Sequence, residues 1–337
     1  MCGPPPPVLA FHAKQRCTTK TGSEGLNRCG PRHRGGFDYV LAMAGVAFVD
    51  GEYVPIEQAR IPILDWGFLR SDATYDVVHV WRGSFFRLAD HIERFVGGVR
   101  RLRLRLPLDE SEIERILTEC VRRSGLRETY VEMICTRGVP APGSRDPRRA
   151  SNAFYAFAIP FVWIADEKQR ETGLSLHISD RERISPRAVD PRTKNYHWLD
   201  LTLGLFDAYD AGAETVVLVD RAGNVVEGPG FNVFAVAGGV LATPATGILE
   251  GITRRTVIEL AREQGREVRE VRVPADALQS ADEVLITSTA GGVMPVTSVG
   301  GEPVGRGTVG PVTRALRDAY WRLHDDPRFA TPITYGD

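Results

Sequence analysis

The chain has 337 residues, of which 43% are hydrophobic and 25% are charged, and its formal net charge at pH 7 is −1. This balance is typical of a globular protein and gives no indication of nucleic acid or an anionic membrane as a partner. No apolar run approaches the roughly 18 residues that a membrane-spanning helix needs, and the N-terminus lacks the apolar core of a signal peptide. We therefore expect a cytoplasmic protein that binds neither nucleic acid nor membrane.

Cysteine and lysine usage indicate which kinds of site the chain can contain. The five cysteines form no C-x-x-C pair, which argues against a metal site and against a disulfide framework. Lysine and arginine total 42, yet only Lys14, Lys20, Lys168 and Lys194 are lysine. Codon bias explains such a preference at the surface. Because arginine neither forms a Schiff base nor loses its proton near neutral pH, a lysine that persists in this chain is a candidate for chemistry.

The first half of the chain begins with residues 1–36, which are rich in Pro, Gly, Arg and Cys and show no periodicity, so we expect a disordered extension. Alternating patterns then predict β-hairpins over 46–56 and 75–88, the first around an Asp50-Gly51 turn. We further expect helices over 88–104, with Asp90 as N-cap, and over 109–124, ended by Gly125, and strands over 130–136 and 153–162 that flank a loop at 137–151.

The second half mixes strands and helices without strict β-α-β alternation, so we expect an α+β fold with two domains. The expected strands lie near 174–180, 215–219, 231–236, 267–273 and 283–288, and the expected helices near 198–211, 254–265 and 309–324. The short charged segment 166–172 is a natural connection between domains. The expected boundaries are the extension over 1–36, a small α/β domain over 37–163, a linker over 164–173 and a large α/β domain over 174–337.

Lys194 is the first candidate catalytic residue. It lies between a proline-bounded turn and an aromatic-rich helix start, in the segment 190–198, with few carboxylates beside it. Most lysines are solvated, and Lys168, inside a run of charges, fits that interpretation. A partly desolvated lysine has the depressed pKa that a Schiff-base nucleophile needs.

Two segments of small residues are candidates for binding a phosphate. The segment 247–255 leads into a helix, whose free N–H groups and dipole attract anions, although an ordinary helix start explains it equally. The segment 287–292 follows a strand, and its small side chains would let a phosphate approach the backbone. Arg94 is either a solvated helix arginine or a clamp on such a phosphate. Glu227, ahead of a Gly-Pro-Gly bend, is either a loop glutamate or the carboxylate that keeps a pyridinium nitrogen protonated.

This set of a lysine, an arginine, two small-residue segments and a carboxylate resembles the fold-type IV, or class IV, aminotransferases, which use pyridoxal 5'-phosphate (PLP). The similarity extends over about residues 44–325, and within the family it points to the (R)-selective amine transaminases. The segments that carry the resemblance are 67–77, 85–91, 136–138, 194–195, 227–232 and 289–295.

The resemblance implies a role for each candidate residue. Lys194 would hold PLP as a Schiff base and carry the proton between the substrate α-carbon and the cofactor, and Glu227 would pair with the pyridine nitrogen. The phosphate would be bound by Arg94, Ile252, Thr253 and Thr289. The substrate pocket would be lined by Arg70, Tyr75, Tyr130, Glu132, Trp198 and the turn 289–292, which includes Ala290. The family implies a homodimer with active sites at the interface.

The leading hypothesis is transfer of an amino group from a primary (R)-amine or a D-configured amino acid to a 2-oxo acid such as pyruvate. The alternatives are a branched-chain or D-amino-acid aminotransferase, a PLP lyase of the aminodeoxychorismate type, and a PLP carrier without turnover. Arg70 stands where the (R)-amine subgroup is expected to have histidine, and Leu199 stands where branched-chain enzymes have tyrosine.

The two substrates of the leading hypothesis differ in charge, because pyruvate has a carboxylate and a simple amine has none. A fixed buried arginine would be left unpaired when the amine binds, which costs several kcal/mol. A mobile arginine on the loop 137–151 avoids this cost, and Arg145 is the candidate, with Arg70 as the rival. Solvated loop arginines without such a role are the alternative.

Overall fold

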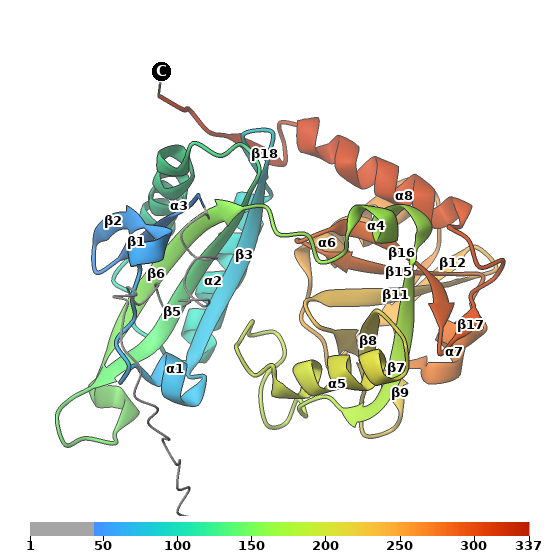
Figure 1. Ribbon diagram of the computed structural model, residues 1–337, viewed down its shortest axis with the longest axis horizontal. Helices are drawn as coiled ribbons and strands as arrows, with labels where there is room; N and C mark the ends of the chain where they lie inside the picture. The colour runs from blue at the N-terminus through green and yellow to red at the C-terminus, as the bar shows by residue number, and fades with distance from the viewer. Residues whose placement is uncertain (1–43, 337) are drawn as a thin grey trace, which may run out of the picture. The chain divides into compact units, whose positions relative to one another are not determined.

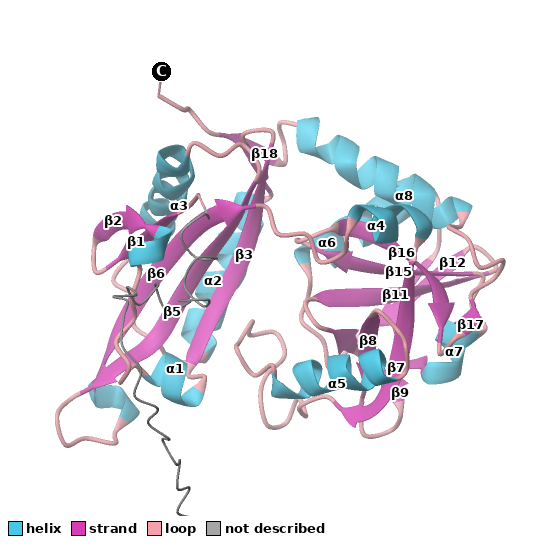
Figure 2. Cartoon of the chain, viewed as in Figure 1, coloured by secondary structure: helices cyan, strands magenta, loops and turns pink. Residues whose placement is uncertain are grey.

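The computed structural model describes residues 44–336, which form two β-sheets with helices packed against them (Figures 1 and 2). The extension predicted over 1–36 lies outside the described residues. The first sheet has seven strands in the order β18-β4-β3-β5-β6-β1-β2. The elements of this part are β1 (Val46–Val49), β2 (Glu52–Pro55), η1 (Ile56–Gln58), α1 (Trp66–Arg70), β3 (Ala73–Trp81), β4 (Ser84–Phe86), α2 (Leu88–Arg101), α3 (Glu110–Ser124), β5 (Thr129–Pro140), η2 (Pro147–Arg149), β6 (Ala150–Pro160) and β18 (Ala330–Pro332).

The two faces of the first sheet have different roles. Successive side chains of a strand point to opposite faces, so Val78 of β3 and Val131 of β5 join the core beneath α2 and α3, which cover one face (Figure 1). In the antiparallel pairing of β3 with β5, Val77 lies opposite Glu132, and His79 lies opposite Tyr130. These four side chains therefore share the other face, which α2 and α3 do not cover.

The second sheet has eleven strands, nine of them in the order β13-β12-β11-β15-β16-β7-β8-β9-β14, and α6 and α8 share a buried core with β11 and β15. None of the helices described over residues 44–336 is long and apolar enough to cross a bilayer. The elements are α4 (Glu167–Thr172), β7 (Leu174–Glu182), α5 (Leu199–Asp210), β8 (Thr215–Val219), β9 (Asn224–Val225), β10 (Glu227–Gly228), β11 (Phe231–Ala237), β12 (Val240–Pro244), α6 (Ile252–Glu263), β13 (Val268–Val271), β14 (Val273–Pro274), α7 (Ala275–Gln279), β15 (Glu283–Ser288), β16 (Gly292–Val299), β17 (Glu302–Pro303), α8 (Pro311–Arg322) and η3 (Leu323–Asp325).

The predicted α+β class is confirmed, and most expected strands and helices are present, with four corrections. Asp90 is not the N-cap of α2: Arg87 occupies that position, and Asp90 accepts a hydrogen bond from its side chain. The loop predicted over 137–151 is shorter, because β5 and β6 extend into it. The connection predicted over 166–172 contains α4, which is held by a capping box at Asp166. The helix predicted to begin at 254 begins at Ile252.

The C-terminal strand β18 returns to the first sheet, where it pairs with β4 in antiparallel fashion. It lies inside the range 174–337 that was predicted as the large domain. The C-terminal segment thus crosses the predicted boundary between the domains, because its strand belongs to the first sheet.

Two buried histidines meet where α8 ends against β3. The Nε2 atoms of His79 and His324 are 2.7 Å apart, and His324 Nδ1 lies 3.2 Å from the carbonyl oxygen of Tyr320. A carbonyl only accepts, so His324 Nδ1 carries a proton, and in the neutral ring its Nε2 accepts from His79. The His324 ring also stacks on Phe86 at 4.0 Å. Burial lowers the pKa of His324 to about 4, against the opposing effect of the Tyr320 carbonyl.

This pair predicts acid-sensitive stability. Between pH 6.5 and about 4 the unfolded chain binds a proton at His324 and the folded chain does not. The contribution of His324 to stability is therefore fully present above pH 6.5 and is lost as the pH falls toward about 4. The expected loss from this histidine is about 2 kcal/mol between pH 7 and pH 5. Denaturant unfolding at pH 7 and at pH 5 gives the free energy of unfolding of wild type and of His324→Leu. The difference between the two pH values should be smaller for the variant than for wild type. The half-buried His177 supplies the control His177→Leu, and an equal loss in wild type and His324→Leu would contradict the prediction.

Candidate active site

The backbone at Lys194 is bound to the first sheet, although the residue lies on the segment between β7 and α5. Its carbonyl oxygen accepts hydrogen bonds from the backbone N–H of Tyr75 at 3.1 Å and from the hydroxyl of Thr74 at 2.8 Å. Asn195 forms an isolated β-bridge with Thr74. Gly98 of α2 leaves the space for Thr74, because a Cβ there would lie 2.4 Å from its Oγ1. The position of the lysine therefore depends on the packing of α2 against β3.

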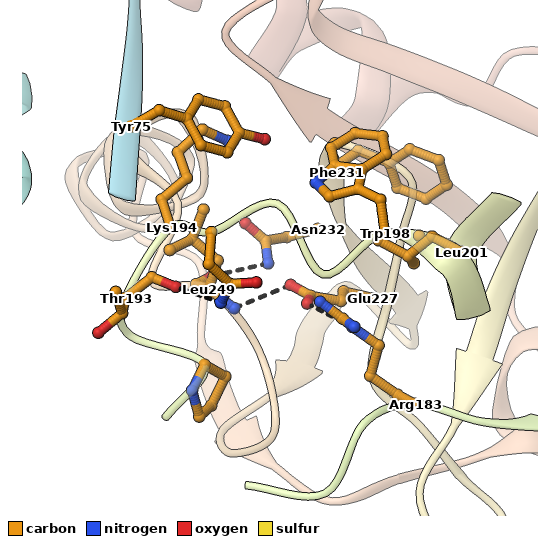
Figure 3. Close-up of a pocket in the computed structure, with 14 residues that line it drawn as sticks. Tyr75, Arg183, Thr193, Lys194, Trp198, Leu201, Glu227, Phe231, Asn232 and Leu249 are labelled. Atoms are coloured by element: carbon orange, nitrogen blue, oxygen red, sulfur yellow. Dashed lines mark hydrogen bonds and ion pairs between the residues drawn. The ribbon is translucent and has the colours of Figure 1, made fainter. Parts of the chain in front are cut away.

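The amine of Lys194 has an environment suited to a nucleophile. Its side chain reaches toward the ring of Tyr75, with Nζ 4.6 Å from the ring centroid (Figure 3). Burial lowers the pKa of Lys194, and the positive charge of Arg94 lowers it further, against the opposing charges of Asp76, Glu132 and Glu227. A lowered pKa increases the fraction of neutral amine, which is the form that attacks a carbonyl.

Glu227, in β10, is a buried carboxylate with two fixed partners. Its Oε2 accepts a hydrogen bond from the backbone N–H of Leu249 at 2.8 Å, and its Oε1 lies 3.2 Å from Nε of Arg183 (Figure 3). Arg183 also pairs with Asp200 at 2.7 Å. Burial raises the pKa of Glu227, whereas Arg183 and the N–H of Leu249 act against this rise. The carboxylate is thus oriented from one side, in the same small cavity as Lys194.

A larger cavity of about 540 Å³ also contains Lys194. Its lining is mainly apolar and aromatic, and Lys194 and Glu214 are its charged members. Arg70 and Arg145 are exposed and do not line it. Besides Lys194, five other predicted site residues line it, namely Tyr75, Tyr130, Trp198, Thr289 and Ala290.

The predicted phosphate residues are divided between cavities. Arg94 and Ile252 line a third cavity of about 680 Å³, whereas Thr289 lines the cavity of about 540 Å³ and Thr253 is buried. Arg94 is held by Asp76, which is fully buried and accepts from Nε at 2.7 Å and from Nη2 at 2.8 Å. Burial alone would raise the pKa of Asp76, but the charge and hydrogen bonds of Arg94 lower it overall.

Four residues of the site were missed at the level of sequence, although two signals were available. Asp76 lies within the segment 67–77 that carries the family resemblance, and Tyr196 is two residues from the lysine. Arg183 and Thr193 gave no signal, because arginines are common in this chain and a threonine before a lysine is ordinary. Thr193 is buried in the small cavity, and its hydroxyl has no hydrogen-bond partner among the described residues.

The amino-transferase class IV family matches residues 73–299. The chain belongs to the class IV aminotransferases. A branched-chain-amino-acid aminotransferase of Pseudomonas aeruginosa is 30% identical over 83% of this chain and 92% of its own length. A D-alanine aminotransferase of Staphylococcus haemolyticus is 27% identical over 81% of this chain and 95% of its own. The solved branched-chain amino acid aminotransferase from Thermobaculum terrenum in its PLP form has a TM-score of 0.78 at 26% identity, covering 86% of this chain and 98% of the other.

The predicted cofactor, PLP, is confirmed by this membership, since class IV aminotransferases depend on PLP and act on amino and 2-oxo acids. The site of this class IV aminotransferase fits the cofactor in three respects. Lys194 has a lowered pKa, Glu227 is a buried carboxylate, and Thr193 offers in the same cavity a hydroxyl that no residue of 44–336 hydrogen-bonds. A buried polar atom without a partner costs free energy, so a ligand that supplies the partner is favoured.

The buried pair of Asp76 and Arg94 predicts a large stability effect. Asp76→Asn leaves a largely buried arginine without its counter-charge, and we expect the free energy of unfolding to fall by about 3–5 kcal/mol. Asp72→Asn is the matched control, because Asp72 also holds an arginine through two hydrogen bonds of 2.9 Å but is more exposed. Denaturant unfolding should show a clearly smaller loss for the control, and equal losses would show that burial is not the cause.

Proposed function

We propose that the chain transfers an amino group from a primary (R)-amine or a D-configured amino acid to a 2-oxo acid such as pyruvate. The observation that carries the proposal is the 540 Å³ cavity, in which Lys194 faces mainly apolar and aromatic side chains and, among residues 44–336, no arginine. An amine without a carboxylate can be buried there without leaving an arginine unpaired. The (R) or D configuration is supported by the resemblance of the sequence segments.

The proposed roles follow the chemistry of each side chain. PLP, when bound, withdraws electrons from the substrate α-carbon and so permits proton loss there. Lys194 would bond the cofactor and move that proton, for which a neutral amine is needed. Glu227 would contact the ring nitrogen, and Arg183 would keep the carboxylate in place. Arg94, Ile252, Thr253 and Thr289 would bind the phosphate.

A second candidate is transamination of branched-chain amino acids. Branched-chain-amino-acid aminotransferases are among the similar proteins, and an apolar cavity also suits an aliphatic side chain. The two candidates differ in the donor, because a branched-chain amino acid carries a carboxylate next to its amine. Initial rates with (R)- and (S)-1-phenylethylamine, D-alanine and L-leucine, each with pyruvate as acceptor, distinguish them, and a strong preference for L-leucine would reject the first proposal.

The first test concerns the proposed catalytic lysine. Lys194→Ala should lower turnover by more than about 10²-fold, because both the covalent attachment and the proton carrier are lost. Mass spectrometry after borohydride reduction should find PLP bonded to the wild-type chain and not to the variant. Lys168→Ala, at an exposed lysine, is the control and should retain both properties. Substantial turnover by Lys194→Ala would reject the mechanism.

The second test concerns the carboxylate of the acceptor. No arginine among the described residues lines the cavity, so we propose that Arg145 moves in from its exposed position to bind pyruvate. Arg145→Ala should raise the KM for pyruvate about tenfold, equivalent to roughly 1.4 kcal/mol, and leave the half-reaction with an apolar amine nearly unchanged. Arg148→Ala on the same loop is the control. Single-turnover rates measure the half-reaction with pyruvate and the half-reaction with the amine separately. If Arg145→Ala affects both half-reactions equally, the role passes to Arg70.

A further inference from the structure

The segment that connects β6 to α4 forms one wall of the 540 Å³ cavity. Two of its apolar side chains, Val162 and Ile164, line the cavity and are exposed. Trp163, which lies between them, packs instead among aromatic rings, with its ring centroid 4.6 Å from that of Phe161 and 5.8 Å from that of Trp321. The aromatic contacts of the segment therefore leave Val162 and Ile164 available to a ligand in the cavity.

The position of Ile164 is fixed by its neighbours. Its backbone N–H donates a hydrogen bond to the carbonyl oxygen of Ala290 at 2.8 Å. The next residue, Ala165, is buried in the core of the second sheet. Gly291 leaves space for the side chain, because a Cβ at Gly291 would lie 3.0 Å from Cγ2 of Ile164. These contacts hold the side chain of Ile164 against the turn 289–292.

Ile164 and Trp198 approach each other across Gly230. Cδ1 of Ile164 lies 3.7 Å, and Cη2 of Trp198 lies 3.5 Å, from the point that a Cβ of Gly230 would occupy. The sum of these distances limits the separation of the two atoms to about 7 Å. Carbon atoms in contact are about 3.5–4.0 Å apart, so at most one layer of carbon atoms fits between the two side chains. We call this pair of side chains the constriction.

The constriction lies near one end of an elongated cavity. Trp198 and Lys194 both line the large cavity and also the small cavity that contains Glu227. Further along α5, Leu205 and Tyr209 line the large cavity alone. The helical rise of 1.5 Å per residue places Tyr209 about 16 Å from Trp198 along the helix. A substituent that extends from an amine at Lys194 toward Tyr209 therefore passes the constriction.

We propose that Ile164 is a specificity-determining residue that, together with Trp198, admits a flat or unbranched substituent of the donor and excludes a thicker one. This inference rests on the proposed function, because it names the shape of the amine donor that the site accepts. A planar aryl ring is a single layer of carbon atoms, whereas a puckered cyclohexyl ring is thicker than one layer. An apolar pocket discriminates against one excess methylene by roughly 10–200-fold, so a comparable preference is expected between these two rings.

The experiment uses two neutral, unreactive probes with the same number of carbon atoms, benzyl alcohol and cyclohexylmethanol, with the PLP-loaded protein. Isothermal titration calorimetry gives the dissociation constant of each for wild type and for Ile164→Ala. Wild type should bind benzyl alcohol at least about tenfold more tightly, and the substitution should reduce this ratio at least about threefold, because it widens the constriction. A wild-type preference for cyclohexylmethanol, or a ratio that Ile164→Ala leaves unchanged, would overturn the proposal.

The matched control is Val162→Ala, which removes apolar atoms from the same segment and the same cavity but not from the constriction. It should leave the ratio near that of wild type, and an effect equal to that of Ile164→Ala would overturn the assignment to Ile164. The wild-type comparison needs no variant, so poor folding of Ile164→Ala leaves the proposal testable.

Turnover is measured separately, as kcat/KM for (R)-1-phenylethylamine and (R)-1-cyclohexylethylamine with pyruvate as acceptor. The phenyl compound should be preferred in wild type, and less so in Ile164→Ala. Discrimination between the two alcohols without turnover of either amine would reject the proposed function while retaining the role of Ile164.

Discussion

The arrangement of the site depends on one backbone group, the carbonyl of Lys194. The segment that carries the lysine has little regular secondary structure, so its own backbone does not hold it in place. The two donors from Thr74 and Tyr75 satisfy both lone pairs of this oxygen and join the segment to the end of β3. The ring of Tyr75 on β3 then faces the amine, so the same strand holds the lysine backbone and forms part of the cavity wall.

Charge pairing explains why this lysine is available for chemistry. Asp76 is engaged by Arg94, and Glu227 by Arg183, so neither carboxylate pairs directly with the lysine amine. Moving charged groups from water into the protein interior costs free energy, so buried ion pairs contribute little net stability. Their value here is local: they hold a phosphate-binding candidate and a carboxylate in fixed orientations, while burial of Lys194 lowers its pKa.

Local signals predicted the fold well wherever one short segment was sufficient. The helix α3 is an example, because Asp109 forms a capping box and Gly125 adopts the left-handed conformation that ends it. The strand β16 was missed because Pro295 lies within it, paired with Leu285, and proline argues against a central strand. The strand β18 was missed because its partner β4 lies more than two hundred residues earlier, and no local pattern records such a pairing.

The sequence by itself determined the family and the α+β class and singled out Lys194 and Glu227 as candidates, since each rests on short motifs whose chemistry is local. Only the tertiary structure decided which charges meet. Arg94 is 18 residues from Asp76, Arg183 is 44 from Glu227, and Tyr196 is 64 from Glu132. The strength of an interaction between charges depends on their distance in space and on their burial, and neither quantity is contained in the order of residues along the chain.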